Sequence, residues 1–277
     1  MNLDEQKAKA GSFRSMHRGV KILVLPNAWD VASARVFEDA GFGAIATTSA
    51  GVAFSLGYPD GQKIRRDEML ARIARIAKAV KVPVTADVEA GYGDRPEDAE
   101  RTTREVIEAG AVGMNLEDST GDADRPLTDL SRQVERVRAV KAAALKTGVF
   151  LLLNARTDVY LAEVGAPETR YDETVRRLVA YRDAGADCVF VPGLRDTDTI
   201  GRLVKDVKCP LNILVGPGSP TVSALEKLGV ARVSVGSSAM RATLGLVKRI
   251  ANELRGSGTY STLEGGIAYA DVNKMLQ

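Results

Sequence analysis

Residues 83–119 have the sequence PVTADVEAGYGDRPEDAERTTREVIEAGAVGMNLEDS. Two short apolar runs, at 83–91 and 112–119, enclose a polar segment of helical length that stops at Gly110. The N-terminal halves of the runs are apolar without strict alternation, which is typical of parallel strands covered on both faces. A glycine at the end of the helix supplies the left-handed residue that turns the chain back into the sheet. The stretch therefore predicts one strand–helix–strand unit of a parallel sheet.

The same unit recurs along the chain. Gly41, Gly185 and Gly229 end segments similar to the one that ends at Gly110, and each precedes a new apolar run by two or three residues. Further strands are predicted at 21–28, 44–51, 149–158, 188–194, 211–218 and 232–239. Helices are predicted at 65–80, from Thr128 and Asp129 to about Lys146 with Gly148 as the stop, and from Asp172 and Glu173 onward.

Eight such units within about 230 residues, without a linker or a shift in composition, predict the α/β class and a single (β/α)8 TIM barrel. The barrel is expected over about 20–256 of a single domain that spans 1–277, with a tail at 257–277. An open doubly wound sheet is the alternative. That fold favours a glycine-rich dinucleotide turn after the first strand, where this chain has Pro26-Asn27-Ala28-Trp29.

The composition excludes several classes of function. Among 277 residues, 38 Lys+Arg oppose 36 Asp+Glu, and a net charge of +2 does not attract nucleic acid or an anionic membrane. The N-terminus lacks the apolar core of a signal peptide, and no apolar run approaches the ~20 residues that span a bilayer. Two Cys favour a reducing compartment, so a cytoplasmic location is expected. A single His excludes His-rich zinc sites and histidine relays.

Acidic residues gather where the predicted strands end, which is where barrels of this kind carry their sites. They are Asp60, Asp87, Glu89, Glu117 and Asp118. Asp87 and Glu89 are two residues apart, so on a strand they point to the same side. Converging carboxylates raise one another's pKa unless a cation is present, and a set of oxygen ligands favours Mg²⁺, with Mn²⁺ as an option. Alternatively, these acids are solvated loop charges or partners of Arg65, Arg66 and Arg95.

Arg156 follows an apolar strand in the run VFLLLNARTD, 149–158. A guanidinium at the end of such a strand needs an anionic partner, and its planar fork suits a substrate carboxylate or oxyanion. A fixed ion pair with Glu117 or Asp158 is the alternative, and both arrangements are compatible. No Lys is expected at the C-terminal end of a strand, although Lys63 lies in a loop, so a Schiff-base aldolase is not favoured.

Other residues are expected to have structural roles. The loops Gly216-Pro217-Gly218-Ser219 and Gly236-Ser237-Ser238 lie where many barrels bind phosphate, but such residues also form simple tight turns. His17 precedes the first strand and is expected on the surface. Cys188 and Cys209 fall at the N-terminal ends of strands, on the face opposite the site, so neither is expected to be a nucleophile.

Several segments, in order along the chain, resemble the isocitrate lyase/phosphoenolpyruvate mutase superfamily. They are LPNAWD at 25–30, TTSAG at 47–51, LGYPD at 56–60, DVEAGYG at 87–93, NLEDS at 115–119 and NARTD at 154–158. The fourth resembles the family's acidic pair followed by Gly-aromatic-Gly. Five of these motifs lie at predicted strands in the right order, and LGYPD follows the second of them in a loop. This order makes the resemblance specific, and it implies a TIM barrel with a metal-dependent site.

The resemblance implies a role for each matching acid. Asp87 would be the principal Mg²⁺ ligand, and Glu89 and Glu117 would hold the ion through its waters. Asp60 would be a loop acid near the metal and the substrate. By the same resemblance, Asp60, Glu117 and Arg156 are the expected catalytic residues.

The resemblance also implies a substrate-binding set. Arg156 would bind the substrate carboxylate or its enolate oxygen. Thr48, Ser49 and Ala50 would present backbone N–H groups and a hydroxyl to a carboxylate, and Asn212 would make a further carboxylate contact. The expected partner is a small 2-oxo or 2-hydroxy carboxylate.

The loop after the fourth strand departs from the family pattern. Lyases of the family carry Lys-Lys/Arg-Cys-Gly there, and the Cys delivers a proton to the cleaved enolate. This chain instead has STGDADRP at 119–126, without a thiol. The resemblance then implies a Mg²⁺-dependent lyase that cleaves a C–C bond of a 2-oxo or 2-hydroxy di- or tricarboxylate through a metal-stabilised enolate. Decarboxylation makes the least demand on such a site, because the leaving CO2 supplies the electrons. Mutase-type P–C chemistry and a non-catalytic 2-oxo acid binder are the alternatives.

The tail after Gly258 is expected to be helical from about Thr262 and to pack on the barrel or on a neighbouring subunit. The resemblance implies homodimers or homotetramers in which a C-terminal helix is exchanged between subunits. The substrate within the carboxylate and phosphonate classes and the oligomeric state remain open at the level of sequence.

Overall fold

The computed structural model describes residues 2–19 and 21–277. Its sheet consists of parallel strands in the order β1-β9-β8-β7-β6-β5-β4-β3-β2. The strands are β1 (Leu23–Leu25), β2 (Asn27–Ala28), β3 (Ile45–Thr47), β4 (Val84–Asp87), β5 (Gly113–Glu117), β6 (Leu152–Arg156), β7 (Cys188–Val191), β8 (Leu211–Leu214) and β9 (Arg232–Ser234). Each lies within a predicted run, and the α/β barrel is confirmed. The expected start of the barrel near residue 20 falls at a residue outside the described ranges.

Pro26 divides the first predicted strand into β1 and β2. Proline has no N–H for a sheet ladder, although its carbonyl still accepts a hydrogen bond from Ala46 N at 2.9 Å. β1 pairs with β9 through Leu23 and Arg232, and β2 pairs with β3 on the other side. Because one residue separates β1 from β2, the two ends of the strand order meet and the sheet forms a nearly closed barrel.

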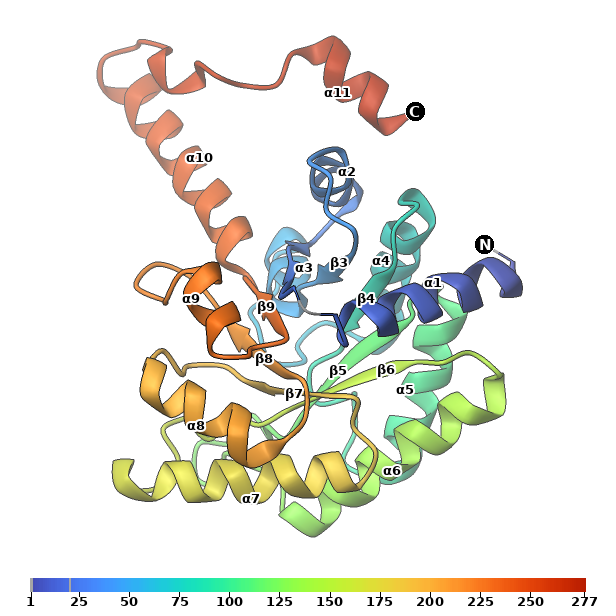
Figure 1. The fold of residues 1–277 in the computed structure, drawn as a ribbon. Coiled ribbons are helices and arrows are strands. Elements are labelled where there is room, and N and C mark those ends of the chain that lie inside the picture. Colours follow the sequence, from blue (N-terminus) through green and yellow to red (C-terminus); the bar gives the residue numbers. More distant parts are fainter. Residues whose placement is uncertain (1, 20) are drawn as a thin grey trace.

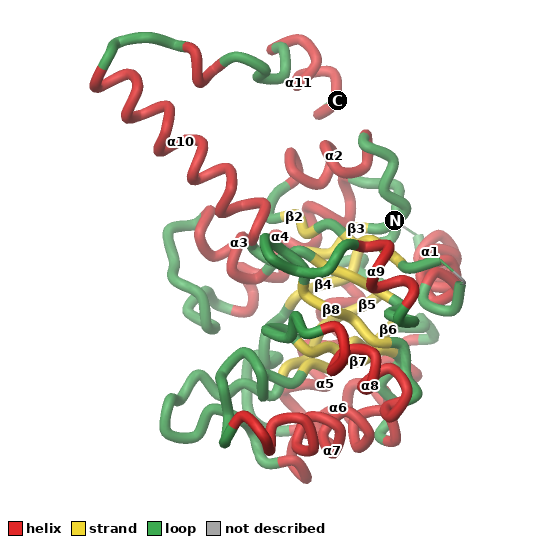
Figure 2. The backbone as a smooth tube through the Cα atoms, turned by 60° about the vertical axis from the view of Figure 1, so that its left-hand side comes forward, coloured by secondary structure: helices red, strands yellow, loops and turns green. Residues whose placement is uncertain are grey.

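Helices surround the barrel, and Figures 1 and 2 show the strands at the centre of this ring. They are α1 (Leu3–Met16), α2 (Val31–Asp39), α3 (Ser49–Ser55), α4 (Arg66–Ala79), α5 (Pro96–Glu108), α6 (Leu130–Thr147), α7 (Arg170–Asp183), α8 (Thr197–Val207), α9 (Val222–Lys227), α10 (Ser238–Gly256) and α11 (Tyr269–Leu276), with 3-10 turns at η1 (Pro167–Thr169) and η2 (Ser261–Leu263). The three helices predicted at residue level correspond to α4, α6 and α7. Gly148 ends α6 at a φ of 71°, as expected. Within residues 2–19 and 21–277 no helix combines the length and apolar character needed to cross a membrane.

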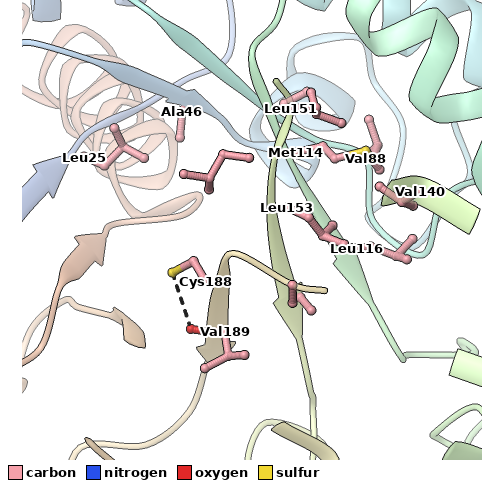
Figure 3. Close-up of a cluster of buried hydrophobic side chains, with 14 of the residues drawn as sticks. Leu25, Ala46, Val88, Met114, Leu116, Val140, Leu151, Leu153, Cys188 and Val189 are labelled. Atoms are coloured by element: carbon pink, nitrogen blue, oxygen red, sulfur yellow. Dashed lines mark hydrogen bonds between the residues drawn. The ribbon is translucent and has the colours of Figure 1, made fainter. Parts of the chain in front are cut away.

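The core lies inside the barrel and between the strands and their helices, as the buried cluster in Figure 3 shows. Helix α1 closes the N-terminal end of the barrel. Phe13 is fully buried, and a Cβ added at Gly113 would lie 2.8 Å from Phe13 Cε1 and 2.7 Å from Thr85 Oγ1. A side chain at Gly113 would therefore displace the helix that covers this end.

The expectation of a surface position for His17 is wrong. Its side chain is only 5 % exposed, its ring meets Phe13 edge-to-face at 4.7 Å, and Nδ1 lies 2.9 Å from Phe13 O. Burial, assisted by the positive charge of Arg232, lowers the pKa of His17 to about 4. The sequence does not indicate this position, because α1 precedes the first strand and only the tertiary packing brings its end beneath the barrel.

Both cysteines are free thiols at the N-terminal ends of strands, as expected. Cys188 is fully buried in the core of Figure 3, where its Sγ lies 3.8 Å from Val189 O. Burial raises the pKa of Cys188 well above its usual range and that of Cys209 to about 12. Neither thiol has the acidity of a nucleophile.

The C-terminal tail packs on a helix of the barrel, one of the two predicted arrangements, but its helix begins later than predicted. Helix α10 extends away from the barrel, and the chain then turns back so that α11 contacts α2 of the same chain (Figure 1). The last helix begins at Tyr269 and not near Thr262, where η2 forms only a 3-10 turn. Glu253 accounts for the difference, because it accepts hydrogen bonds from Thr259, Ser261 and Thr262 and holds this segment in a turn.

Candidate active site

Asp87 is the last residue of β4 and lies at the C-terminal mouth of the barrel. Its Oδ2 accepts hydrogen bonds from Ser49 N at 2.9 Å and from Ser49 Oγ at 2.8 Å. Its backbone N–H donates to Thr47 Oγ1 at 2.8 Å. The side chain is 9 % exposed, so the carboxylate is held rigidly at the edge of the core.

Two asparagines on the neighbouring strands orient Asp87. Asn115 Nδ2 donates to Asp87 Oδ1 at 3.2 Å, and Asn154 Nδ2 donates to Asn115 Oδ1 at 2.8 Å. The residues are in register across β4, β5 and β6. No role was predicted for either asparagine, although both lie in the NLEDS and NARTD motifs and the predicted strand order makes them neighbours.

Glu89 lies just beyond β4 in the left-handed region, with a φ of 52°. Strand alternation therefore does not extend to it, yet Glu89 still faces the other carboxylates. Its Oε2 accepts a hydrogen bond from Gln62 N at 2.5 Å, whereas its buried Oε1 has no hydrogen-bond partner among the described residues. Burial, then repulsion from Asp87 and Asp60, raises the pKa of Glu89 to about 7.

Glu117 and Arg156 end β5 and β6 and are paired in register. Arg156 Nη1 lies 2.7 Å from Glu117 Oε2, while its Nε and Nη2 bind the two oxygens of Asp158 at 2.5 and 2.8 Å. Burial opposes the charge of Arg156, but Glu117 and Asp158 raise its pKa above the ordinary value. The sequence offered a fixed ion pair with Glu117 or Asp158 as the alternative role of Arg156, and the structure has both ion pairs.

Burial dominates the titration of Glu117. Together with repulsion from Asp158, Asp87 and Glu89 it raises the pKa of Glu117 above the ordinary value, although Arg156 opposes the shift. Several carboxylates therefore compete for the single guanidinium of Arg156. This competition is the electrostatic condition that a cation relieves.

Two further groups face the carboxylates. Asp60 lies on the exposed loop after α3, and partial burial together with Asp87 raises its pKa, while Gly61 N–H and Arg156 oppose the shift. The hydroxyl of Tyr92 is buried without a partner among residues 2–19 and 21–277. Burial, followed by the charges of Glu89, Asp87, Asp60 and Glu117, raises the pKa of Tyr92 above its usual range, so the phenol stays protonated. No role was predicted for its hydroxyl, which only the tertiary structure places here.

The residues expected to bind substrate have structural partners in this structure. Thr48 caps α3, with Gly51 N donating to Thr48 Oγ1 at 3.3 Å, and Ser49 holds Asp87. Ala50 follows in the buried first turn of α3. Asn212 is fully buried in β8, and its amide is hydrogen-bonded to Ser234 at 3.2 Å. The substrate-binding roles of these residues stay predictions.

The loop after β5 is closed by hydrogen bonds between its own residues. Ser119 and Leu127 form an antiparallel bridge, Thr120 N donates to Pro126 O at 3.0 Å, and Thr120 Oγ1 donates to Arg125 O at 2.5 Å. The polar groups of this short loop therefore bond within the loop, and the loop has no Cys that could provide a thiol to the site. The glycine-rich segment after β8 also forms a tight turn, since Gly216 N donates to Ser219 Oγ at 3.0 Å.

The site residues fit a hard cation. No three His, Cys, Asp or Glu side chains in the described part of the chain are arranged to bind one ion together. Mg²⁺ nevertheless binds proteins through only one or two carboxylates and keeps several waters. Asp87, Glu89 and Glu117 offer oxygen ligands only, and Oε1 of Glu89 is a buried acceptor that receives no hydrogen bond from the described residues.

A parallel barrel with these acids and Arg156 at its C-terminal mouth is the arrangement that the sequence motifs imply. The family model of phosphoenolpyruvate phosphomutase matches residues 13–255. The chain therefore belongs to this family, within the isocitrate lyase/phosphoenolpyruvate mutase superfamily of carbon–carbon lyases.

Similar proteins agree with this assignment. A solved structure of a candidate lyase/mutase from Burkholderia cenocepacia is 42 % identical, with a TM-score of 0.93 over 98 % of this chain and 96 % of that one. An oxaloacetate decarboxylase from Ectopseudomonas mendocina is 31 % identical over 89 % of this chain and 84 % of its own length. A 2-methylisocitrate lyase from Bacillus subtilis is 29 % identical over 74 % of this chain and 67 % of its own.

Proposed function

We propose that the protein is a Mg²⁺-dependent lyase that cleaves a C–C bond of a small 2-oxo or 2-hydroxy di- or tricarboxylate, with oxo-acid decarboxylation as its favoured reaction. One observation carries the proposal. Glu89 has a buried oxygen without a hydrogen-bond partner among the described residues, and burial, followed by repulsion from Asp87 and Asp60, raises its pKa to about 7. A cation on these oxygens relieves the repulsion, and an anionic substrate then becomes acceptable at the site.

Asp87 would hold the ion directly, and Glu89 and Glu117 would hold it through water. Mn²⁺ has the same preference for oxygen ligands and would substitute. When bound, the metal would polarise the keto and carboxylate oxygens of a 2-oxo acid.

Arg156 would bind the substrate carboxylate or the developing enolate oxygen. Glu117 and Asp158 already fix its guanidinium at 2.7 Å and 2.5 Å, so the group needs little reorganisation when the substrate arrives. Loss of CO2 from a 3-carboxy-2-oxo acid needs no base, because the breaking bond supplies the electrons of the enolate. The loop after β5 has no Cys to return a proton, but Asp60 and the protonated phenol of Tyr92 also face the site.

The test is incubation with Mg²⁺ and a panel of oxaloacetate, isocitrate, methylisocitrate and phosphonopyruvate, with products followed by NMR. Pyruvate and CO2 from oxaloacetate, above the metal-only rate, are the expected result. Binding of these acids by calorimetry without any product would contradict the lyase and favour a non-catalytic 2-oxo acid binder.

A second candidate is P–C bond chemistry on phosphonopyruvate or a related phosphonate. The match to the phosphoenolpyruvate phosphomutase family model supports it. A phosphonate differs from the favoured substrate only in its leaving group, so the same acids and Arg156 would serve. Phosphorus NMR distinguishes the two, since a new phosphate or phosphate-ester signal appears only if the P–C bond is broken or rearranged.

We further propose that the chain acts as a single domain and assembles as a homodimer or homotetramer through α10. Among the residues of this helix only Met240 is buried, while Leu244, Val247 and Leu254 are 47 %, 58 % and 48 % exposed. A second copy of the chain supplies the simplest cover for such an apolar stripe. With both thiols reduced, the cytoplasm is the compartment we expect for the assembled enzyme.

A further inference from the structure

Asp118 follows the last residue of β5, but its side chain is completely buried against α7. Its Oδ2 accepts hydrogen bonds from Tyr181 OH at 2.6 Å, from Thr157 Oγ1 at 2.7 Å and from Arg177 Nη1 at 3.1 Å. Its Oδ1 accepts from Asp158 N at 3.0 Å. The carboxylate thus joins the ends of β5 and β6 to a helix on the outside of the barrel.

Asp118 acts on the two residues that follow Arg156. It binds the side chain of Thr157 and the backbone N–H of Asp158, which fixes the chain at the end of β6. The carboxylate of Asp158 then binds Arg156 through both Nε and Nη2. The direction of the Arg156 guanidinium is therefore set by a residue whose backbone Asp118 holds.

Arg177 ties this arrangement to α7. Its Nη1 also donates to Thr128 O at 2.9 Å, and its Nε donates to Glu173 Oε1 at 2.7 Å. Thr128 N in turn donates to Asp118 O at 2.7 Å. A buried ion pair whose remaining polar atoms are hydrogen-bonded has one preferred geometry, whereas removal of one partner leaves an uncompensated charge.

We propose that Asp118, Arg177 and Tyr181 form a positioning cluster that holds Asp158 and thereby sets the orientation of Arg156. The inference rests on the proposed function, in which Arg156 binds the carboxylate of an oxo acid. None of the three touches the guanidinium, so they act through Asp158. A displacement of about 1 Å in a binding group costs on the order of 10²-fold in rate, which is the scale of effect expected here.

The test compares Asp118→Asn and Tyr181→Phe with the control Gln6→Met. Asn keeps the shape of Asp118, but its NH2 group cannot accept the hydrogen bonds now made to Oδ2. Gln6 is also buried, and its Nε2 donates to Ile107 O at 2.7 Å and to Ala111 O at 3.1 Å, from a helix that closes the N-terminal end of the barrel. The control therefore loses buried hydrogen bonds without changing any contact of the positioning cluster or of Arg156.

Oxalate, a planar dianion similar to an oxo-acid enolate, is titrated by calorimetry in the presence of Mg²⁺, and the melting temperature of each variant is measured alongside. Asp118→Asn is expected to raise the oxalate Kd about 100-fold and Tyr181→Phe several-fold, while Gln6→Met stays within about twofold despite a lower melting temperature. Wild-type affinity in Asp118→Asn, or an equal loss in the control, would overturn the inference.

NMR of the arginine Nε–H groups tests the inference without any ligand or activity. The Arg156 signal, assigned by its loss in Arg156→Lys, is expected to shift or broaden in Asp118→Asn and in Tyr181→Phe but not in Gln6→Met. An unchanged signal in both cluster variants would overturn the inference. If wild type binds no oxalate and turns over no oxo acid, the proposed function fails, and this spectrum still decides the positioning role.

Discussion

Glu89 combines two unfavourable features that proteins rarely tolerate together. It is a non-glycine residue with a φ of 52°, and it is a buried acid with one unpartnered oxygen. Backbone strain of this kind persists where the surrounding structure imposes it, and it is concentrated at functional sites. The nearby Tyr92 is also left-handed, with a φ of 58°. At the scale of single residues, both features support the metal-binding role that we propose for the turn after β4.

Asp87→Asn tests the metal proposal at this scale. Asparagine keeps the hydrogen bonds to Ser49 in part but removes the charge, so we expect Mg²⁺ binding by calorimetry to be lost. Turnover should fall about 10³-fold or more, equivalent to about 4 kcal/mol of transition-state stabilisation. Asp124→Asn, on the exposed loop after β5, is the control and should change neither quantity. Undiminished activity in Asp87→Asn would contradict the assignment.

His17 predicts a pH dependence of stability. Its folded pKa of about 4 lies below the ordinary histidine value of 6.5, so the unfolded chain binds the extra proton first as the pH falls. The free energy of unfolding should therefore decrease as the pH drops below 6.5, until the folded His17 is also protonated near 4. From about pH 7 to about pH 5 this group contributes a loss of about 2 kcal/mol.

Urea unfolding of wild type and His17→Gln across this range measures the effect. Glutamine removes the titrating ring, so the variant should lose less stability on acidification, and the difference between the two slopes belongs to His17. Identical slopes would show that the imidazole is charged or accessible in the folded protein.

Elements at the C-terminal end of the chain are organised by one carboxylate. Glu253, near the end of α10, accepts hydrogen bonds from Thr259 Oγ1, Ser261 N, Ser261 Oγ and Thr262 N. These bonds lower the pKa of Glu253 below its usual range. The carboxylate therefore stays ionised and keeps accepting these hydrogen bonds at ordinary pH, and only strong acid would protonate it. The return of the chain toward α2 starts at this turn.

Glu253→Gln is expected to increase hydrogen exchange at the amides of Ser261 and Thr262 while exchange in the barrel strands stays unchanged. The amide can accept through only one oxygen, and its NH2 group faces donors. Glu264→Gln, an exposed change on the same segment, is the control. Equal protection in Glu253→Gln and wild type would show that the turn does not depend on this carboxylate.

At the scale of the whole molecule, α10 extends away from the barrel (Figure 2), and Met240 is the one buried residue of this helix. Leu244, Val247 and Leu254 recur at helical spacing on this helix. We expect Leu244→Lys with Val247→Lys to convert the assembly to monomers in sedimentation experiments without unfolding the barrel. Leu145→Lys removes a leucine on α6 that is 83 % exposed and should leave the assembly intact. A wild-type monomer would contradict the proposed assembly.

Local sequence patterns predicted most of the fold. Apolar runs located each strand, and glycines such as Gly110 and Gly148 located the helix ends, because both signals depend on neighbours along the chain. The same patterns located Asp87, Glu117 and Arg156, since the residue that ends a barrel strand is determined by where the strand lies. The metal and substrate roles of these residues came from the resemblance and remain to be tested.

The tertiary structure alone decided which groups meet. His17 became a core residue because α1 crosses the end of the barrel, and Asp118 became a partner of Arg177 and Tyr181 because α7 packs outside β6 and β7. Glu253 set the start of the last helix through residues six to nine positions away. The contacts of His17 and Asp118 depend on distances between elements that are far apart in the sequence. Periodicity along the chain carries no information about those distances, and packing of the complete barrel determines them.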